Sequence, residues 1–330
     1  APTADEFTIG SHFTVNASGN DYIAYVFAHN DAQFGEGGDQ SIIKCGYYSG
    51  NDSSNGTVVN LGWEPQWILI KRNNHSEDWM LFDTMRGIRT QLYDLDFRIN
   101  DASAEADNRD WIDVNSTGFQ LKSPWAHVNA SGSKYTYIAI RRPDGYVSKP
   151  VDAGTDVFAM DAGNGNTTEA FTSGFPVDFA IIKETGGSSD WEACFRLTDG
   201  QYVQPNTSGS MGASSPFSFD SSTGWLSSGS AYNSNYQSWM WKRHAGFDVV
   251  AYEGTNVGGL QVSHSLNAVP EMIWTKNRDA TENWAVYHKG LNGGTNPEQY
   301  GIRLSTTGAE IDHDGFWNDT APTATAFTVG

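Results

Sequence analysis

The amino-acid sequence predicts an all-β protein built from tandem antiparallel β-sandwich modules of the lectin or jelly-roll kind. Glycine is abundant, with 35 residues, and 13% of the chain is aromatic; this composition is typical of many short strands joined by turns. No long stretch follows a helical period, and residues 91–111, which have some helical character, lack a continuous apolar stripe and are expected to form an irregular insertion. One spacing of lysine and tryptophan recurs along the chain, which predicts repeats.

In three places a lysine is followed eight positions later by a tryptophan: Lys71 and Trp79, Lys183 and Trp191, and Lys276 and Trp284. Each time a proline opens a short apolar strand that ends at the lysine, a polar turn follows, and the tryptophan begins a second strand. This layout predicts one β-hairpin copied three times.

Further elements recur around each hairpin. Upstream, residues 41–50, 154–163 and 246–254 predict a strand that ends in glycine. Downstream, a glycine–aromatic pair recurs at 118–119, 224–225 and 315–316, and an aromatic strand closes the copy at 137–142 and 238–243. The third copy shows no such closing strand up to residue 330.

The missing strand has a counterpart near residue 1. The segment APTADEFTIG (1–10) resembles APTATAFTVG (321–330) and continues into residues 12–28. Residues 1–28 are therefore predicted to be the terminal strands of a repeat. Either the chain is a slice of a longer array, or these strands complete the last module in the same molecule or in a neighbouring one. The predicted modules are 35–142, 148–245 and 246–330, the last lacking its final strand unless 1–28 or a neighbouring chain supplies it.

Composition limits the classes of partner. The net charge of −19 repels phosphate, so neither nucleic acid nor an anionic membrane is an expected partner. No apolar segment reaches the roughly 20 residues that cross a bilayer, and the first residues lack the features of a signal peptide. The acidic side chains are expected to solvate the surface; a few could hold Ca²⁺, but no EF-hand pattern occurs, and no cofactor is predicted.

No sequence motif predicts catalysis. A phosphate-binding loop, a metalloprotease histidine pair and a G-x-S-x-G elbow are all missing from the sequence, and the eight histidines lack ligand spacing. The protein is predicted not to be an enzyme; a glycan hydrolase with two carboxylates beside exposed aromatics is the catalytic alternative. Cys45 and Cys194 hold different strand positions in their copies, which favours two buried free thiols over a disulfide.

Tryptophan can fill a core or stack on a sugar. The repeat-equivalent Trp79, Trp191 and Trp284 lie in apolar runs and are predicted to anchor the core of each copy. The anchor lysines are expected to end a strand with a wet ammonium group, weakly paired across the hairpin with Asp78, Asp190 and Asn283. Aromatics outside the shared pattern are candidates for contact with a glycan or another subunit, with packing between modules as the alternative: Trp63, Trp111, Trp125, Tyr232, Tyr236 and Trp317.

The segments PQWILIKR (65–72), EDWMLFDTMRG (77–87), GFQL (118–121) and YIAYVFA (22–28) resemble the repeats of virion structural and tail-fibre proteins of marine bacteriophages, which are similar to lectin-like sandwich modules. The resemblance implies a β-rich appendage or capsid-surface protein on a phage particle, assembled as a homo-oligomer with other virion proteins and able to contact host-surface glycans. The alternative is a secreted bacterial carbohydrate-binding adhesin or filament subunit, in which residues 1–28 complete the last module of the next subunit by strand addition.

Overall fold

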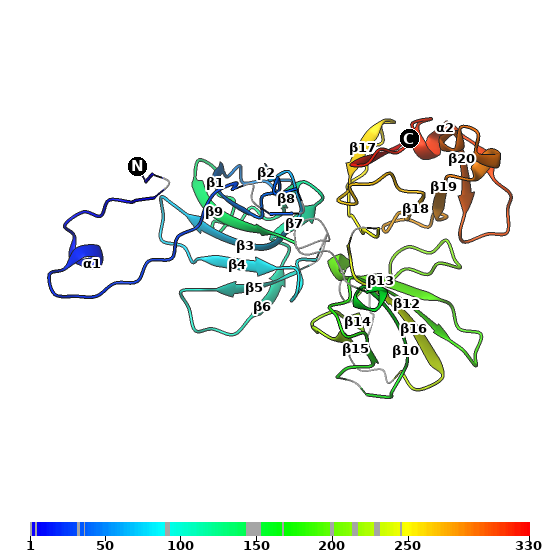
Figure 1. The fold of residues 1–330 in the computed structure, drawn as a ribbon, viewed down its shortest axis with the longest axis horizontal. Coiled ribbons are helices and arrows are strands. Elements are labelled where there is room, and N and C mark those ends of the chain that lie inside the picture. Colours follow the sequence, from blue (N-terminus) through cyan, green and yellow to red (C-terminus); the bar gives the residue numbers. More distant parts are fainter. Residues whose placement is uncertain are drawn as a thin grey trace.

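The protein is all-β in the computed structural model, as the sequence predicts, with many short antiparallel strands and few helices. The structure describes residues 2–3, 5–31, 34–35, 37–89, 93–142, 153–166, 168–198, 201–212, 217–227, 232–244 and 246–330. The strands form three groups, called here modules 1, 2 and 3, which occupy separate regions of the molecule (Figure 1).

Module 1 is a sandwich of a six-stranded and a three-stranded sheet. The larger sheet has the order β1 (Ile43–Ser49), β9 (Lys134–Arg141), β3 (Pro65–Arg72), β4 (Met80–Asp83), β5 (Asp94–Arg98) and β6 (Ala106–Arg109). The smaller has the order β2 (Val58–Asn60), β8 (Gly118–Leu121) and β7 (Ile112–Asn115). Alternate side chains of both sheets, such as those of Ile68 and Phe119, meet in one fully buried core.

Module 2 repeats this plan on a smaller scale. One sheet has the order β10 (Phe158–Ala162), β16 (Tyr236–Trp241), β12 (Phe179–Glu184) and β13 (Glu192–Phe195), and the other has β11 (Phe171–Thr172), β15 (Gly224–Ser227) and β14 (Phe217–Ser218). Short 3-10 turns, η1 (Gly154–Asp156) and η2 (Arg196–Thr198), precede β10 and follow β13. In modules 1 and 2 alike, the last strand in sequence, β9 or β16, lies between two others.

Module 3 is less complete. Its sheets have the orders β18 (Met272–Thr275), β19 (Ala285–His288), β20 (Tyr300–Arg303), β21 (Ile311–Asp312), and β17 (Leu260–Ser263) with β22 (Ala326–Val329). Two 3-10 turns, η3 (Leu291–Gly294) and η4 (Pro297–Gln299), and helix α2 (Asp314–Trp317) fill the connections. Residues 248–254, which the repeat predicts to be a strand, have no strand conformation.

Two details differ from the sequence prediction. The segment 91–111 is no irregular insertion: β5 and β6 lie within it and extend the large sheet of module 1. The glycine–aromatic pair at 315–316 is not the counterpart of 118–119, because it lies in α2. Phe327 is the true equivalent of Phe119, since β22 pairs with β17 as β8 pairs with β2.

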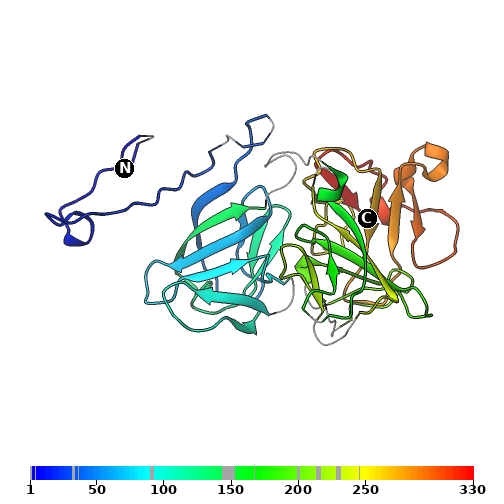
Figure 2. The ribbon, with the colours of Figure 1, turned by 60° about the horizontal axis from the view of Figure 1, so that its bottom comes forward.

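Residues 5–31, called here the arm, lie outside the sandwiches and contain one short helix, α1 (Phe13–Asn16). Figures 1 and 2 both show the arm extending from module 1 on the side away from module 3. Its base is held where the N–H of Asn30 donates to the carbonyl of Ile43, at 2.9 Å. Among the described residues, no helix is long and apolar enough to span a membrane.

The glycine that ends the first strand of a copy has a packing role. A Cβ added to Gly50 would lie 2.3 Å from the carbonyl oxygen of Ala130, and one added to Gly163 would lie 2.3 Å from that of Tyr232. In each module, therefore, the strand end lies directly against the turn that leads into β9 or β16.

We expect Gly50→Ala and Gly163→Ala to lower the free energy of unfolding by about 1–3 kcal/mol, because backbone must move to admit the methyl group. Urea denaturation followed by tryptophan fluorescence measures the loss. Gly186→Ala is the control, since nothing lies within 4 Å of its added Cβ. Equal effects of the three substitutions would show that the close approach is not the cause.

Candidate functional site

Two features distinguish this protein from a set of independent sandwiches: a buried ionic cluster where the three modules meet, called here the junction, and the exposed arm. The junction is built from residues at the ends of repeat elements. Arg142 follows β9 and Arg243 follows β16, so they are repeat-equivalent. Glu64 precedes β3, and Asp248 lies at the start of module 3.

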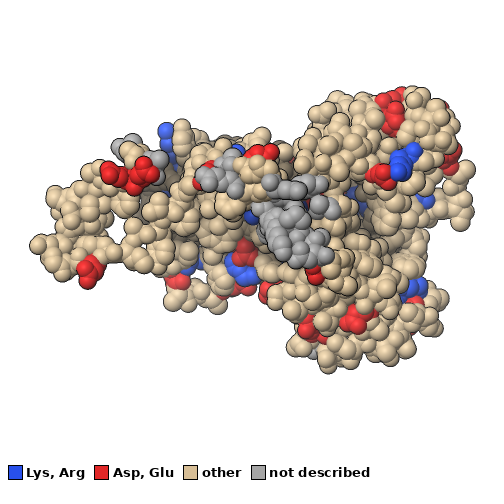
Figure 3. Space-filling view, in the orientation of Figure 1, with Lys and Arg blue, Asp and Glu red and all other residues tan. Residues whose placement is uncertain are grey.

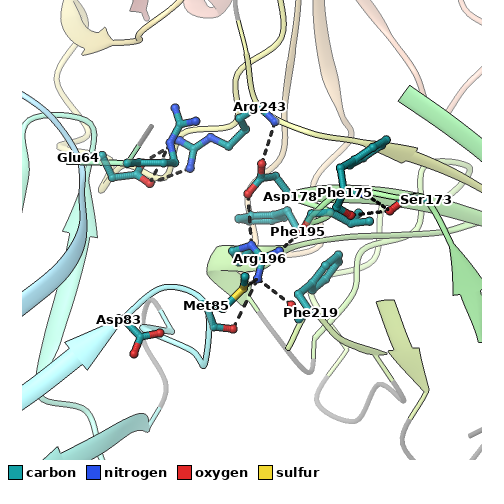
Figure 4. A network of polar contacts seen from close by, with 12 residues as sticks. Glu64, Asp83, Met85, Ser173, Phe175, Asp178, Phe195, Arg196, Phe219 and Arg243 are labelled. Atoms are coloured by element: carbon teal, nitrogen blue, oxygen red, sulfur yellow. Dashed lines mark hydrogen bonds and ion pairs between the residues drawn. The ribbon is translucent and has the colours of Figure 1, made fainter. Parts of the chain in front are cut away.

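The guanidinium of Arg243 holds the centre of the junction. Its Nη1 and Nη2 donate to the two carboxylate oxygens of Glu64, each at 2.7 Å, and its Nε donates to Oδ1 of Asp248 at 2.8 Å. The backbone N–H of Arg243 donates to Oδ2 of Asp178 at 2.8 Å. Figure 4 shows Glu64 and Arg243 facing each other with Asp178 close by. One side chain of module 2 thus binds modules 1 and 3 together.

Arg142 repeats this contact from module 1. Its Nη2 lies 3.3 Å from Oδ1 of Asp248 and donates to Oγ of Ser265 at 3.1 Å. The other oxygen of Asp248 accepts from the N–H and Oγ of Ser265, at 2.8 and 2.9 Å. Asp248 therefore receives both arginines and the turn of its own module.

A second arginine couples modules 1 and 2. Arg196 donates to the carbonyls of Val177 and Phe219 within module 2 and, through Nη1, approaches the sulfur of Met85 in module 1 at 3.2 Å, as Figure 4 shows. Its Nε also donates to Asp178, at 3.2 Å. Asp178 thus joins Arg196 to the backbone of Arg243 and links this contact to the junction.

Charge keeps the junction ionised. Burial alone would raise the pKa of Asp248, but the charges of Arg243 and Arg142 and the hydrogen bonds from Ser265 outweigh it, and the net effect lowers that pKa. Burial likewise opposes the charge of Arg243, yet Glu64 and Asp248 raise its pKa above the ordinary value. Because the folded pKa of Asp248 is depressed, its contribution to stability is present above the unfolded pKa of about 3.9 and is lost as pH falls through the folded pKa.

A cavity of about 390 Å³ lies beside the junction, between modules 1 and 3. Arg141, Arg142 and Arg243 line it together with Asp39, Glu64 and Asp248, so its wall carries no excess of either charge. Nε1 of Trp63 and Nε and Nη1 of Arg142 make no hydrogen bond, but all three atoms are shut off from solvent. The charged groups of the wall are largely occupied with one another, which is typical of a structural junction.

The repeated lysines and tryptophans have a different role from the one that the sequence predicts. Trp79 is 39% and Trp191 37% exposed, so the prediction that they anchor a core is wrong. Trp284 is buried, but against Val203 and Ala193 of module 2 rather than within its own module, and its Nε1 donates to the carbonyl of Gln204 at 3.0 Å.

Hydrogen bonds explain why the spacing recurs. The Nζ of Lys71, Lys183 and Lys276 donates in each copy to carbonyls of the hairpin turn. The residue before the tryptophan does not pair with the lysine, as predicted, but accepts a hydrogen bond in each copy from a polar side chain further along: Asp78 from Asn100, Asp190 from Asn206 and Asn283 from Ser305.

The same three side chains also accept from the backbone N–H of the tryptophan, at 2.7 Å for Asn100, 3.0 Å for Asn206 and 3.4 Å for Ser305. Each hairpin is therefore closed at both ends by polar contacts, with the lysine over the turn and the polar side chain at the start of the second strand. The indole ring is free to lie on the surface.

The six aromatics predicted to contact a glycan or subunit divide into two groups. Trp63, Trp111, Tyr232 and Trp317 are buried, so their side chains do not form a surface for a sugar. Trp111 donates from Nε1 to Asp96, and Tyr232 donates to Glu192, within their own modules. Tyr236 is partly buried, and Trp125 is 50% exposed with the guanidinium of Arg109 3.7 Å from its ring centre.

Nothing among the described residues forms a group of three or more metal-binding side chains. On the face drawn in Figure 3, acidic side chains are spread over all three modules. Cys45 and Cys194 are free. Burial and the charge of Asp113 raise the pKa of Asp110 to about 7 against the effect of Lys122, but neither acid lines the cavity. The described residues therefore hold no evident catalytic constellation.

The fold and the junction define a protein of tandem β-sandwich repeats whose modules are joined by buried ion pairs. The chain belongs to the family described as a domain of unknown function, DUF7483, which matches residues 1–142 and 217–330. No curated protein and no solved structure matches the chain. Both matched stretches have the same layout, since each begins with terminal strands of a copy and continues through the module that follows.

The hairpin clamp can be tested with Asn100→Ala. We expect the substitution to lower the free energy of unfolding by about 1–3 kcal/mol, because it removes the hydrogen bonds to Trp79 N–H and to Asp78. Urea denaturation measures the difference. Asn74→Ala is the matched control, since this exposed turn asparagine makes only one long contact, at 3.4 Å to Arg72, and a loss there as large as for Asn100 would argue against the clamp.

The junction can be tested with Glu64→Gln, which leaves the buried guanidinium of Arg243 beside a neutral amide. We expect a loss of about 3–5 kcal/mol and a lower transition temperature in calorimetry at pH 7. Glu271→Gln is the matched control, because its ion pair with Lys289 is exposed on both sides, and it should change stability by less than about 1 kcal/mol. A Glu64→Gln variant as stable as this control would contradict a coupling role.

Proposed function

We propose that this protein is a structural subunit of a bacteriophage virion, a tail fibre or capsid-surface decoration, present in several copies and displayed on the particle surface. The proposal is supported by the resemblance of its hairpin segments to such repeats and by an all-β architecture with short polar turns. Proteins of this kind resist unfolding and proteolysis while their loops vary.

The junction is the observation that carries the proposal. A chain of sandwiches joined by bare linkers would bend freely between modules. Here Arg243, Glu64 and Asp248 join all three modules through buried contacts, and Trp284 packs module 3 against module 2. A fibre or surface cover transmits force or holds a fixed shape, and this coupling suits that task better than it suits independent binding domains.

Contact with host-surface glycans is the second part of the proposal. Trp125, half exposed beside Arg109, presents an indole ring of the kind that stacks on a sugar. Trp191 lies 5.5 Å from Trp239, ring centre to ring centre, and is partly exposed. The sequence prediction did not include Trp191 among the contact residues; its signal was the parity of its strand, since Ala193 and Cys194 are the buried residues that follow.

The alternative function, a secreted bacterial adhesin or filament subunit assembled by strand addition, is favoured by one observation. The arm exposes a run of large apolar side chains, among them Tyr22, Ile23, Tyr25, Val26 and Phe27. Such a run is unusual on the surface of a monomer and is typical of an interaction segment.

Immunogold electron microscopy separates these functions. Antibodies against the recombinant protein are applied to particles and cells from lysed cultures that carry the gene. We expect label on phage particles, at the tail for a fibre or over the head for a decoration. Label on cell-surface filaments with bare particles would replace the proposal by the alternative, and label on neither would overturn both.

A further inference from the structure

The large sheet of module 3 lacks the strand that is central in the other two modules. β9 lies between β1 and β3, and β16 lies between β10 and β12. Their equivalents in module 3 are β18 and residues 248–254, but β18 pairs only with β19, and no described strand lies along its other edge. Module 3 therefore has an open position, called here the slot, between β18 and residues 248–254.

The core beside the slot is thin. Among the described residues, the main clusters of modules 1 and 2 contain 20 and 12 buried residues, whereas that of module 3 contains 4. Val250 and Ile273, on the two sides of the slot, are only partly buried. Ile68 and Ala180, the equivalents of Ile273, are fully buried beside β9 and β16. Apolar surface thus remains uncovered where the central strand would lie.

A glycine reports the same vacancy independently. Gly50 and Gly163 pack so closely against the turn before β9 or β16 that a Cβ would meet a carbonyl oxygen, but nothing lies within 4 Å of a Cβ built on Gly254. The turn that the first two glycines contact is therefore missing beside the third.

The arm carries the sequence of the missing turn and strand. The segment VNASGNDY (15–22) differs from VNASGSKY (128–135) at two positions. Continued without a gap, this alignment places Ala17 on Ala130, Val26 on Ala139 and His29 on Arg142. Ala130 is the residue whose carbonyl lies against Gly50, and Ala139 is the buried centre of β9.

Resting on the proposed function, which places several copies in one assembly, we infer that residues 15–29 of one copy occupy the slot in module 3 of a second copy. The arm adds the central strand of the sheet by antiparallel pairing on both sides. The partner of this surface is therefore another copy of the same chain.

The pairing of β9 with β3 fixes the register of the donated strand. Ala139 faces Ile68 and Tyr137 faces Ile70, so Val26 faces Ile273 and Ala24 faces Thr275 in the assembly. Because side chains alternate along a strand, Tyr22, Ala24 and Val26 point into the core of module 3, while Ile23 and Tyr25 point outward. The carbonyl of Ala17 then lies against Gly254.

The geometry of the arm favours a second copy over closure within one molecule. The arm base is fixed to β1 by the hydrogen bonds from Asn30 N–H to Ile43 O, 2.9 Å, and from Cys45 N–H to His29 Nδ1, 3.1 Å. From there it runs away from module 3 (Figures 1 and 2). A neighbouring copy can meet it in this direction, whereas closure requires it to turn back past module 1.

Two matched substitutions test the register. In the free arm Val26 is 75% and Ile23 77% exposed, so Val26→Asp and Ile23→Asp change a general stickiness equally. In the slot only the aspartate at 26 enters the core, where an unpaired charge is strongly disfavoured. By sedimentation velocity over a concentration series, Val26→Asp should weaken self-association at least about 100-fold and Ile23→Asp less than about 5-fold. Equal effects would overturn the proposal.

Gly254→Val tests the slot from the other side. Gly254 is exposed and has free space around it, so the substitution leaves the fold of the single chain intact, as circular dichroism can verify. The added methyl groups meet the carbonyl of Ala17 in the assembly. Self-association should therefore fall at least about 100-fold, and unchanged association would contradict the insertion.

Disulfide trapping separates donation between copies from closure within one. One full-length chain carries Ala24→Cys and another carries Thr275→Cys, and the two are mixed and oxidised. A cross-linked heterodimer on non-reducing gels is expected, and the pair of Ile23→Cys with Thr275→Cys should give far less. Bonds that form only within a chain carrying both cysteines, or no bond at all, overturn the proposal. Gold label on particles without any cross-link would leave the proposed function standing and remove only strand donation.

Discussion

The last strand of each sandwich is the element on which the other contacts depend. β9 pairs along both edges, with β1 and with β3, and β16 does the same in module 2. Each strand then leads directly to an arginine of the junction, Arg142 or Arg243. One segment therefore completes a sheet, covers a core and fixes the module to its neighbours, and a module without this segment has an open sheet and a thin core.

Buried ion pairs are an unexpected means of fixing modules, because apolar contacts of equal size are often as stable. What the junction adds is direction. A planar guanidinium that donates two parallel hydrogen bonds to one carboxylate, as Arg243 does to Glu64, defines an angle as well as a distance. Contacts of Asp248 with both arginines then fix the third module. This is a hypothesis about specificity, since an assembly of repeated parts needs a defined angle between them.

The sequence predicts the all-β class and the repeats because both arise from local patterns of strand, turn and spacing. It does not show which face of a strand is buried at the point where a turn ends. Trp79 follows the same turn as Met80 and Phe82 but has the opposite parity, and those two residues fill the core. The alternation of apolar residues at 80 and 82 could have placed Trp79 outside, had strand parity been weighed against the size of the ring. The partner of its backbone, Asn100, lies far along the chain and gives no local signal. The same distance hides the junction, in which Glu64 and Arg243 are 179 positions apart; the only hint was the basic pair that closes two of the repeats.

The position of the central strand within each copy has a consequence for assembly. Because this strand comes last in sequence yet lies in the middle of the sheet, the sequence repeat and the folded module do not share a boundary. The family match has the same offset, since each matched stretch begins with terminal strands of one copy and runs into the next module. A chain with the strand in residues 15–29 and the slot in module 3 carries complementary donor and acceptor surfaces. Such surfaces differ from each other, so their pairing is head to tail and does not close a two-fold dimer. A fibre could grow by this contact alone, and the main-chain hydrogen bonds inside one module would also join one molecule to the next.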